Sequence, residues 1–147
     1  MKKDSKGGFL ISQIKQIQGR VFERLLSEAN VHEFNGAQGR ILYVLWQDDS
    51  VPIVDLSKKT GLAKTTLTSM LDRMEQSGLI TRTFDKKDRR QIRISLTAKA
   101  KSLQDDYDKL SEKMIDIFYK GFDDNDITIF ENNLSKIVSN LMEAENG

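Results

Sequence analysis

Two short stretches of the sequence carry side chains that are suited to binding an anion such as a phosphate group, to which they can donate hydrogen bonds. The first, residues 64 to 73, is rich in hydroxyl groups and runs from Lys64 to Arg73. The second, residues 85 to 90, contains only charged residues, in the order Asp-Lys-Lys-Asp-Arg-Arg. Hydroxyl groups donate and accept hydrogen bonds, and Lys and Arg donate to phosphate. Together the two stretches predict binding to a polyanion.

The hydroxyl-rich stretch has the spacing of a helix. At 100° per residue its apolar side chains, Leu67, Met70, Leu71 and Met74, fall in one sector with Ala63 beside them, which predicts a helix over residues 64 to 77 with Gly78 at its stop. The opposite sector holds slim polar side chains, Thr65, Ser69, Asp72 and Gln76. Slim donors and acceptors can reach base edges in the major groove of DNA. The predicted DNA contacts of this helix are Lys64, Thr65, Thr66, Thr68, Ser69 and Arg73.

The charged stretch lies between two segments of alternating apolar and polar residues, 79 to 84 and 92 to 96, which predict a β-hairpin with a charged tip. The helix over residues 64 to 77 follows a shorter predicted helix over residues 53 to 60 after a tight turn, and such a pair is a helix-turn-helix. A hairpin that follows a helix-turn-helix is the wing of a winged-helix domain. An arginine on such a tip can enter a narrow minor groove. We expect Asp88 to form a fork with Arg90 that holds the guanidinium in place. The predicted DNA contacts of the tip are Lys86, Lys87, Asp88, Arg89 and Arg90.

Further helices are predicted on both sides of these elements. Apolar residues recur at three and four from residue 9 to residue 29, and Asn35 with Gln38 forms a capping box that opens a helix ending near Trp46. The single proline, Pro52, is placed at the start of a short helix that Gly61 ends. Thr97 can serve as the N-cap of a following helix, because its side-chain oxygen can accept from the first free N–H groups. The spacing after it predicts helices over residues 98 to 121 and from about 123 to 142.

Charge is distributed unevenly along the chain although the formal net charge is only +1. Residues 51 to 101 contain 12 Lys and Arg against 5 Asp and Glu, whereas residues 102 to 147 contain 4 against 11. A polyanion would be attracted to the middle of the chain and repelled from its end. The charge distribution therefore predicts that a nucleic acid is attracted to the protein and that it binds on the side formed by the middle of the chain.

Composition narrows the class of protein. The 147 residues suit one domain with a helical extension, and the lack of cysteine excludes thiol chemistry and cysteine-based metal sites in this sequence. We expect no cofactor, no metal and no membrane contact, and the cytoplasm as the location. The single histidine, His32, has no neighbouring residues in the sequence that could form a catalytic or metal-binding group with it. The sequence also contains no glycine-rich phosphate loop and no GxSxG motif. We therefore expect that the protein is not an enzyme.

Across nearly its full length the chain resembles the MarR family of bacterial winged-helix regulators. The resemblance rests on DLSKKTGLAKTTLTSMLDRMEQSGLITR at residues 55 to 82, on Asp88-x-Arg90 in the predicted wing and on Ser-Leu-Thr at residues 95 to 97. It differs from the family pattern at residues 99 to 101, where Lys-Ala-Lys stands in place of the glycine that often follows the Leu-Thr pair. The continuity of the helix at that point is therefore open.

The resemblance implies a mainly α fold with a small β-hairpin, made of a winged helix-turn-helix domain at residues 35 to 97 and helical dimerisation regions at residues 1 to 34 and 98 to 147. It implies a homodimer that binds an inverted repeat in double-stranded DNA, with Arg90 in the minor groove, and acts as a repressor. A small aromatic or lipophilic effector is implied as well, and a crevice for it could include Phe22, His32, Tyr43 and Trp46. The alternative hypothesis is a winged-helix module that binds protein and not DNA.

Overall fold

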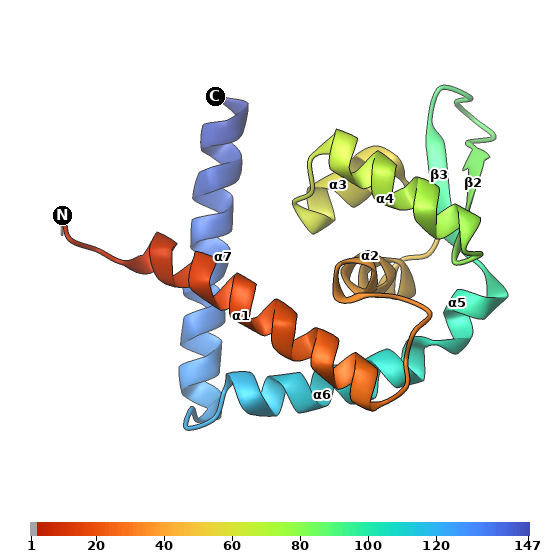
Figure 1. The fold of residues 1–147 in the computed structure, drawn as a ribbon. Coiled ribbons are helices and arrows are strands. Elements are labelled where there is room, and N and C mark those ends of the chain that lie inside the picture. The colour runs from red at the N-terminus through yellow and green to blue at the C-terminus, as the bar shows by residue number, and fades with distance from the viewer. Residues whose placement is uncertain (1–2) are drawn as a thin grey trace. The chain divides into compact units, whose positions relative to one another are not determined.

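The computed structural model describes residues 3–147, and the chain forms two compact units, Met1–Leu110 and Ser111–Gly147. The elements are arranged along the chain as in Figure 1. They are α1 (Gly7–Glu28), α2 (Gly36–Gln47), β1 (Val51–Pro52), α3 (Ile53–Thr60), α4 (Lys64–Gln76), β2 (Ile80–Phe84), β3 (Ile92–Leu96), α5 (Ala98–Ser102), α6 (Gln104–Phe118) and α7 (Asp124–Asn146). The predicted mainly helical fold with one β-hairpin is confirmed.

Local hydrogen bonds fix the ends of the helices where the sequence predicted them. The side chain of Asn35 accepts from the N–H of Gln38, and the Gln38 side chain accepts from the N–H of Asn35, which completes the capping box of α2. Gly61 and Gly78 end α3 and α4 with φ of 75° and 78°, a left-handed conformation that favours glycine. The predicted Thr97 cap is also present, because its side chain accepts from the N–H of Ala100.

The hairpin belongs to a three-stranded antiparallel sheet with the order β1-β3-β2. β2 and β3 pair from Ile80 opposite Leu96 to Phe84 opposite Ile92. β1 was not predicted, because it has only two residues, Val51 and Pro52, and exists through its pairing with β3. Pro52 stands at the start of α3, as predicted, and is its N-cap residue. A proline is tolerated in this edge strand because no further strand needs a hydrogen bond from the N–H that proline lacks.

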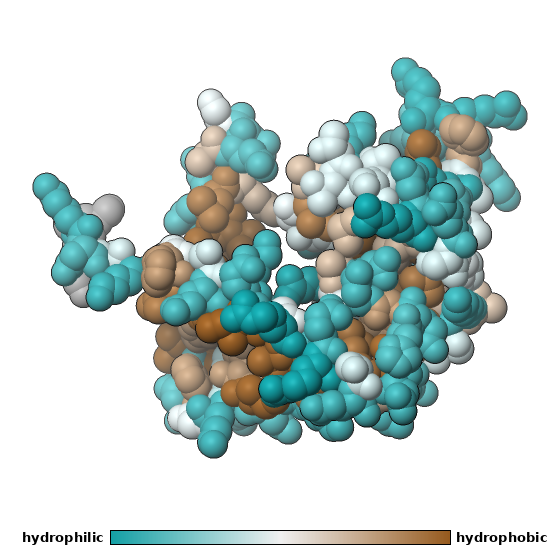
Figure 2. Space-filling view, viewed as in Figure 1, coloured by the Kyte–Doolittle hydropathy of each residue, from teal (hydrophilic) through white to brown (hydrophobic). Residues whose placement is uncertain are grey.

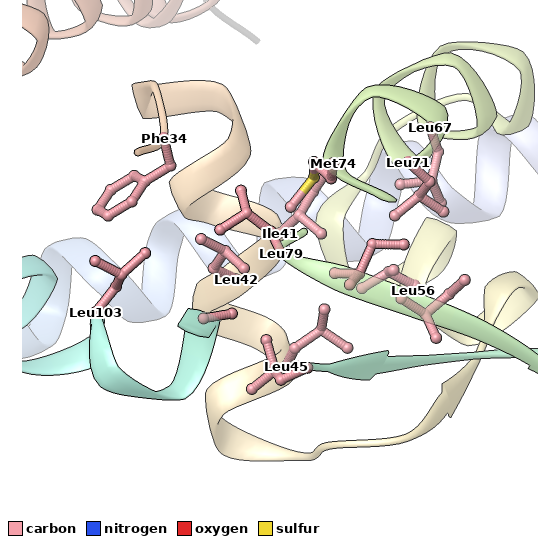
Figure 3. Close-up of a cluster of buried hydrophobic side chains, with 14 of the residues drawn as sticks. Phe34, Ile41, Leu42, Leu45, Leu56, Leu67, Leu71, Met74, Leu79 and Leu103 are labelled. Atoms are coloured by element: carbon pink, nitrogen blue, oxygen red, sulfur yellow. The ribbon is translucent and has the colours of Figure 1, made fainter. Parts of the chain in front are cut away.

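The core of the first unit joins α2, α4 and the sheet. Fully buried side chains from these elements point toward one another (Figure 3). They include Ile41, Leu42 and Leu45 of α2, Leu67, Leu71 and Met74 of α4, and Leu79, Ile80 and Ile94 around the hairpin. Close packing of this kind resists sliding of one element over another. The core therefore fixes how α4 and the hairpin are presented to solvent.

The continuous helix predicted over residues 98 to 121 is wrong. The chain forms α5 and α6 instead, with Leu103 between them and the N–H of Leu103 bonded to the oxygen of Ala100 at 3.1 Å, three residues back. The hydroxyl of Ser102 also donates to the oxygen of Lys99 at 2.6 Å. Tightened three-residue bonds and serine bonding to the preceding turn both bend helices. The position of the break is close to the departure from the family pattern at residues 99 to 101.

Several long helices keep large apolar side chains on the surface. α1 exposes Phe9, Leu10, Ile14 and Ile17, and α7 has no buried residue while it exposes Ile129, Ile137, Val138, Leu141 and Met142. Apolar surface is visible along both helices in Figure 2. Within residues 3–147, none of the helices combines the length and the apolar character that crossing a lipid bilayer would require. Isolated apolar residues are common on protein surfaces, whereas several in a row along a helix indicate a contact surface.

One prediction concerns Gly39, a buried residue of α2. A Cβ at this position would lie 2.9 Å from a ring carbon of Tyr107 and 3.3 Å from one of Phe34. We expect Gly39→Ala to lower the free energy of unfolding by about 1–3 kcal/mol through overpacking, although alanine is the better helix former. Denaturant unfolding at one fixed protein concentration measures the change.

The matched control is Arg40→Ala, at an exposed position of the same helix, which should stay within about 0.5 kcal/mol of the wild type. An unchanged or raised stability of Gly39→Ala would show that the two rings move aside without cost.

Candidate nucleic-acid interface

α4 turns one face into the core and presents the other to solvent. Leu67, Leu71 and Met74 are buried, and the residues predicted to contact DNA, Lys64, Thr65, Thr66, Ser69 and Arg73, are exposed. Two details differ from the predicted apolar sector, because Met70 is only half-buried and Ala63 is exposed. The outer face therefore carries short hydroxyl side chains near the N-terminal end of the helix, as major-groove recognition requires.

Thr68 differs from the other predicted contacts of α4. It is half-buried, and its hydroxyl donates to the backbone oxygen of Lys64 at 2.8 Å. The hydroxyl oxygen can still accept a hydrogen bond, and the methyl group can still touch a thymine methyl. Thr68 is thus suited to a narrower set of contacts than Thr65 or Ser69.

The start of α4 has no side-chain cap. Its N-cap residue is Ala63, so no side chain accepts from the first-turn N–H groups. Uncapped N–H groups and the positive end of the helix dipole attract phosphate, and the neighbouring Lys64 adds a full charge. This end of the helix is therefore suited to positioning the helix on a DNA backbone.

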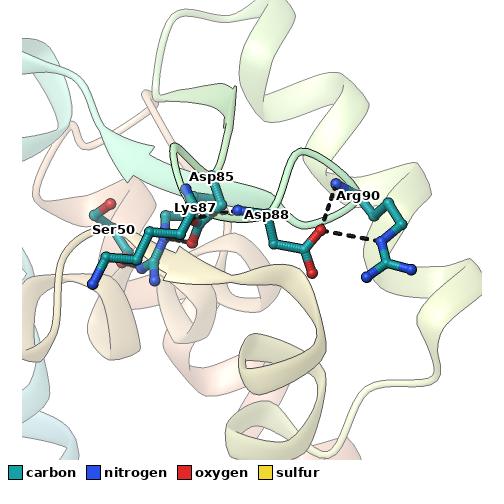
Figure 4. A network of polar contacts seen from close by, with 6 residues as sticks. Ser50, Asp85, Lys87, Asp88 and Arg90 are labelled. Atoms are coloured by element: carbon teal, nitrogen blue, oxygen red, sulfur yellow. Dashed lines mark hydrogen bonds and ion pairs between the residues drawn. The ribbon is translucent and has the colours of Figure 1, made fainter.

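Asp85 organises the wing, residues 85 to 91 between β2 and β3. This residue is only 9% exposed, and its carboxylate accepts from the N–H groups of Lys87 at 2.8 Å and Asp88 at 3.4 Å. The other carboxylate oxygen accepts from Nε of Arg93 at 2.7 Å. Figure 4 shows these groups gathered at the base of the wing. This role of Asp85 was not predicted from the sequence, although an aspartate that accepts from the N–H two residues further on commonly forms a turn.

Arg93 connects Asp85 to the segment beside the opposite edge strand, β1. Its Nη1 donates to the backbone oxygen of Ser50 at 2.6 Å, in the turn that precedes β1. Ser50 has φ of 65°, and its neighbour Asp49 accepts from the N–H of Leu96 at 2.9 Å. The base of the wing is therefore linked to β3 and to the segment that precedes β1.

These contacts also affect the charge of Asp85. The hydrogen bond from Arg93, and after it the bonds from the backbone N–H groups of Lys87 and Asp88, hold the pKa of Asp85 below its ordinary value.

The predicted contact between Asp88 and Arg90 is present. One carboxylate oxygen of Asp88 accepts both from the backbone N–H of Arg90 and from its Nε, each at 3.1 Å (Figure 4). The predicted pairing of Asp88 with the Arg90 guanidinium is therefore confirmed, through one carboxylate oxygen. The Arg90 side chain is 92% exposed, so both terminal nitrogens remain accessible at the tip of the wing. Lys86, Lys87 and Arg89 are exposed as well.

An ion pair connects α4 to the hairpin. Nη2 of Arg82 on β2 donates to the carboxylate of Asp72, a residue predicted on the outer face of α4. Asp72 is thus engaged with the protein, and its negative charge is partly neutralised. The hydroxyl of Thr97 further donates to the oxygen of Gly78 at 2.6 Å, in the turn between α4 and β2. The recognition face of α4 and the wing are therefore held on the same part of the unit, beside each other in Figure 1.

Three of the four candidate effector residues lie in an aromatic cluster around Tyr107. The ring centroids of Phe22, Tyr43 and Trp46 lie 5.9, 6.1 and 5.1 Å from that of Tyr107. Trp46 also donates from Nε1 to the oxygen of Ala100 at 3.0 Å. Rings in contact at these distances stabilise a core. The position of Tyr107 at the centre of this cluster was not predicted from the sequence.

His32, the fourth candidate, lines a separate cavity of about 290 Å³. The cavity is bounded by Glu23, Leu26, Ser27, Val31, His32, Phe34, Asn35 and Gln38. Glu23 is already engaged there, because its carboxylate accepts from the N–H of Gly36. Among residues 3–147, no three His, Asp or Glu side chains lie together in a way that could hold a metal ion.

A helix-turn-helix followed by an anchored wing defines the winged-helix class of DNA-binding proteins. Residues 34–92 match the MarR family. Over 117 residues the chain is 32% identical to the organic hydroperoxide resistance transcriptional regulator of Bacillus subtilis (strain 168), covering 80% of this chain and 73% of the relative. The chain belongs to the MarR family of transcriptional regulators.

A second relative is the HTH-type transcriptional regulator TtmR of Methylorubrum extorquens (strain PA1), 33% identical over 107 residues. That match covers 73% of this chain but 53% of the relative, so the chain spans about half of its length. Neither relative is named as an enzyme.

Solved structures have the same fold. A mutant MarR from E. coli complexed with operator DNA gives a TM-score of 0.77 at 23% identity and covers 88% of this chain and 91% of that chain. A structure concerned with the regulation of DNA binding of Bordetella bronchiseptica BpsR by 6-hydroxynicotinic acid gives 0.78 at 20% identity, covering 90% and 98%. At these identities the likeness concerns the fold.

The role of Asp85 leads to a prediction about pH. Because its folded pKa is lowered, the carboxylate contributes stability that is present above its unfolded pKa, about 3.9, and lost as the pH falls through the folded pKa. We expect Asp85→Asn to lower the free energy of unfolding at pH 7 and to speed amide hydrogen exchange at Lys87 and Asp88. The difference from the wild type should shrink as the pH falls below about 4.

Asp88→Asn is the control, since Asp88 accepts only from Arg90 among the contacts described above. It should leave exchange at Lys87 unchanged. An Asp85→Asn deficit of equal size at pH 3 and at pH 7 would contradict a charge-based anchor.

Proposed function

We propose that the protein is a homodimeric repressor that binds an inverted repeat in double-stranded DNA. The observation that carries the proposal is the joint presentation of the exposed hydroxyl face of α4 and the exposed cationic wing, linked by Arg82 and Asp72. α4 enters the major groove, where Thr65, Thr66, Thr68 and Ser69 meet base edges. Arg90, accessible at the tip of the wing, enters the adjacent minor groove.

Contacts with the phosphate groups of the DNA backbone complete this mode of binding. The uncapped start of α4 and Lys64 meet one phosphate group, and Arg73, Lys86, Lys87 and Arg89 meet others. Asp88 orients the Arg90 side chain through its two hydrogen bonds. The excess of cations in residues 51 to 101 supports attraction to DNA, and the excess of acidic residues in residues 102 to 147 keeps the other end of the chain away from it.

Dimerisation uses residues 1 to 34 and 98 to 147. The support is the apolar stripe of α1 and the lack of any buried residue in α7, which a second copy would cover. A two-fold dimer binds two half-sites about 34 Å apart, one turn of the double helix. The operator is therefore an inverted repeat.

We place the protein in the cytoplasm, with the DNA it binds, and assign it no catalytic role. Release from DNA follows the binding of a small aromatic or lipophilic molecule, a proposal supported by the relation between BpsR and 6-hydroxynicotinic acid and by the aromatic cluster around Tyr107. A thiol-based response is not available to this sequence, which contains no cysteine. Genomic fragments selected by the protein, then challenged with a panel of small aromatic acids, test the target and the effector together.

Arg90→Ala provides a direct test of the wing. We expect a loss of about 1–3 kcal/mol in operator binding and a weaker preference for A·T pairs at the minor-groove position. Each phosphate neutralised adds about 0.9 to the slope of log K against log salt, so loss of a purely phosphate-binding cation such as Lys87 should lower the slope by about that amount. Equilibrium binding at several salt concentrations measures both quantities.

Arg40→Ala is the control, because it removes an exposed charge of α2 that lies outside α4, the wing and the residues proposed for dimerisation. Should Arg90→Ala bind a selected operator as tightly as the control does, the minor-groove assignment would be wrong. A wild-type protein that selects no DNA but captures a protein through the wing would support the alternative, an interaction module.

A further inference from the structure

Phe84 is an exposed aromatic residue on a highly charged surface. Its side chain is 68% exposed, and among residues 55 to 114 it is the one large apolar residue that the surface exposes to this degree. The four cations of the wing follow it within six residues. Apolar surface lies among the hydrophilic side chains at the wing in Figure 2. An exposed ring at this place is unfavourable in water and marks a surface that a partner covers.

The strand directs this ring to the side of the sheet that faces α4. Side chains two residues apart in a strand point to the same face, so Ile80, Arg82 and Phe84 share one face of β2. Ile80 is buried there, and Arg82 reaches Asp72 on α4. Phe84 is two residues nearer to the wing tip than Arg82. The ring therefore lies between the recognition face of α4 and the cations of the wing.

The backbone of Phe84 is held firmly although its ring is exposed. Phe84 pairs with Ile92 in the last register position of the hairpin. The next residue, Asp85, is fixed by Lys87, Asp88 and Arg93, and its N–H donates to the oxygen of Gln91 at 3.0 Å. A ring on such a rigid support loses little conformational freedom when it is covered. Its exposure also means that it contributes little to the core of the unit.

We propose that Phe84 packs against the deoxyribose groups of the DNA strand that separates the two grooves. This inference rests on the proposed function: with α4 in the major groove and Arg90 in the minor groove, the sugar-phosphate backbone passes between them. Sugars present apolar C–H surface and carry no sequence information, so the contact positions the duplex. The flanking cations fit the phosphates on either side. Phe84 thus supplies a part of the affinity that does not depend on counterion release.

The experiment measures the dissociation constant of Phe84→Ala for an operator and for an unrelated duplex of equal length, at several salt concentrations. We expect both dissociation constants to rise by about tenfold, as loss of a buried apolar contact implies. The slope of log K against log salt should stay at the wild-type value. Phe84→Leu, which keeps apolar surface, should recover part of the affinity, and Phe84→Gln should behave as Phe84→Ala.

Thr83→Ala is the matched control, because Thr83 is exposed on the opposite face of β2 and should change nothing. Unchanged affinity of Phe84→Ala overturns the inference, and so does a change in slope near 0.9 or a loss confined to the operator, which would indicate a wedge between particular bases. Failure of the wild type to bind any duplex overturns the proposed function itself. The two failures are thereby distinguished.

Discussion

The arrangement of the interface depends on one packing constraint, the core shared by α4 and the hairpin. Leu67, Leu71 and Met74 pack in the same buried cluster as Ile80 and Ile94. Because a close-packed interior does not allow one element to slide over another, burial of these side chains fixes which residues of α4 face outward. The same burial fixes where the strands leave the core. A recognition surface made of two elements is thus presented as one rigid piece.

Acidic residues within the basic region have a structural role in this account. Asp72 binds Arg82, Asp85 binds Arg93 and Asp88 binds Arg90. Asp85 also replaces the water that the N–H groups of the wing would otherwise bind. These carboxylates lower the net positive charge, but they hold the hairpin in place. A pre-ordered wing loses less conformational entropy on binding than a flexible one.

Local patterns in the sequence predicted most of the elements. The capping box at Asn35, the stops at Gly61 and Gly78 and the alternation on both sides of the wing each involve neighbouring residues, and all are confirmed. Features that depend on distant residues were missed. β1 exists only through β3, and the partner of Asp85 lies eight residues along the chain. The break at Leu103 depends on bonds within one turn that periodicity does not reveal.

The roles in DNA binding of the residues of α4 and the wing remain predictions, and the central claim is that both elements touch one duplex at once. The most direct measurement is a pair of footprints on a selected operator, with dimethyl sulfate for guanine N7 in the major groove and hydroxyl radicals for the sugars. We predict two protected major-groove segments one helical turn apart, each flanked by a protected minor-groove segment. Protection of a single groove, or of one half-site only, would contradict it.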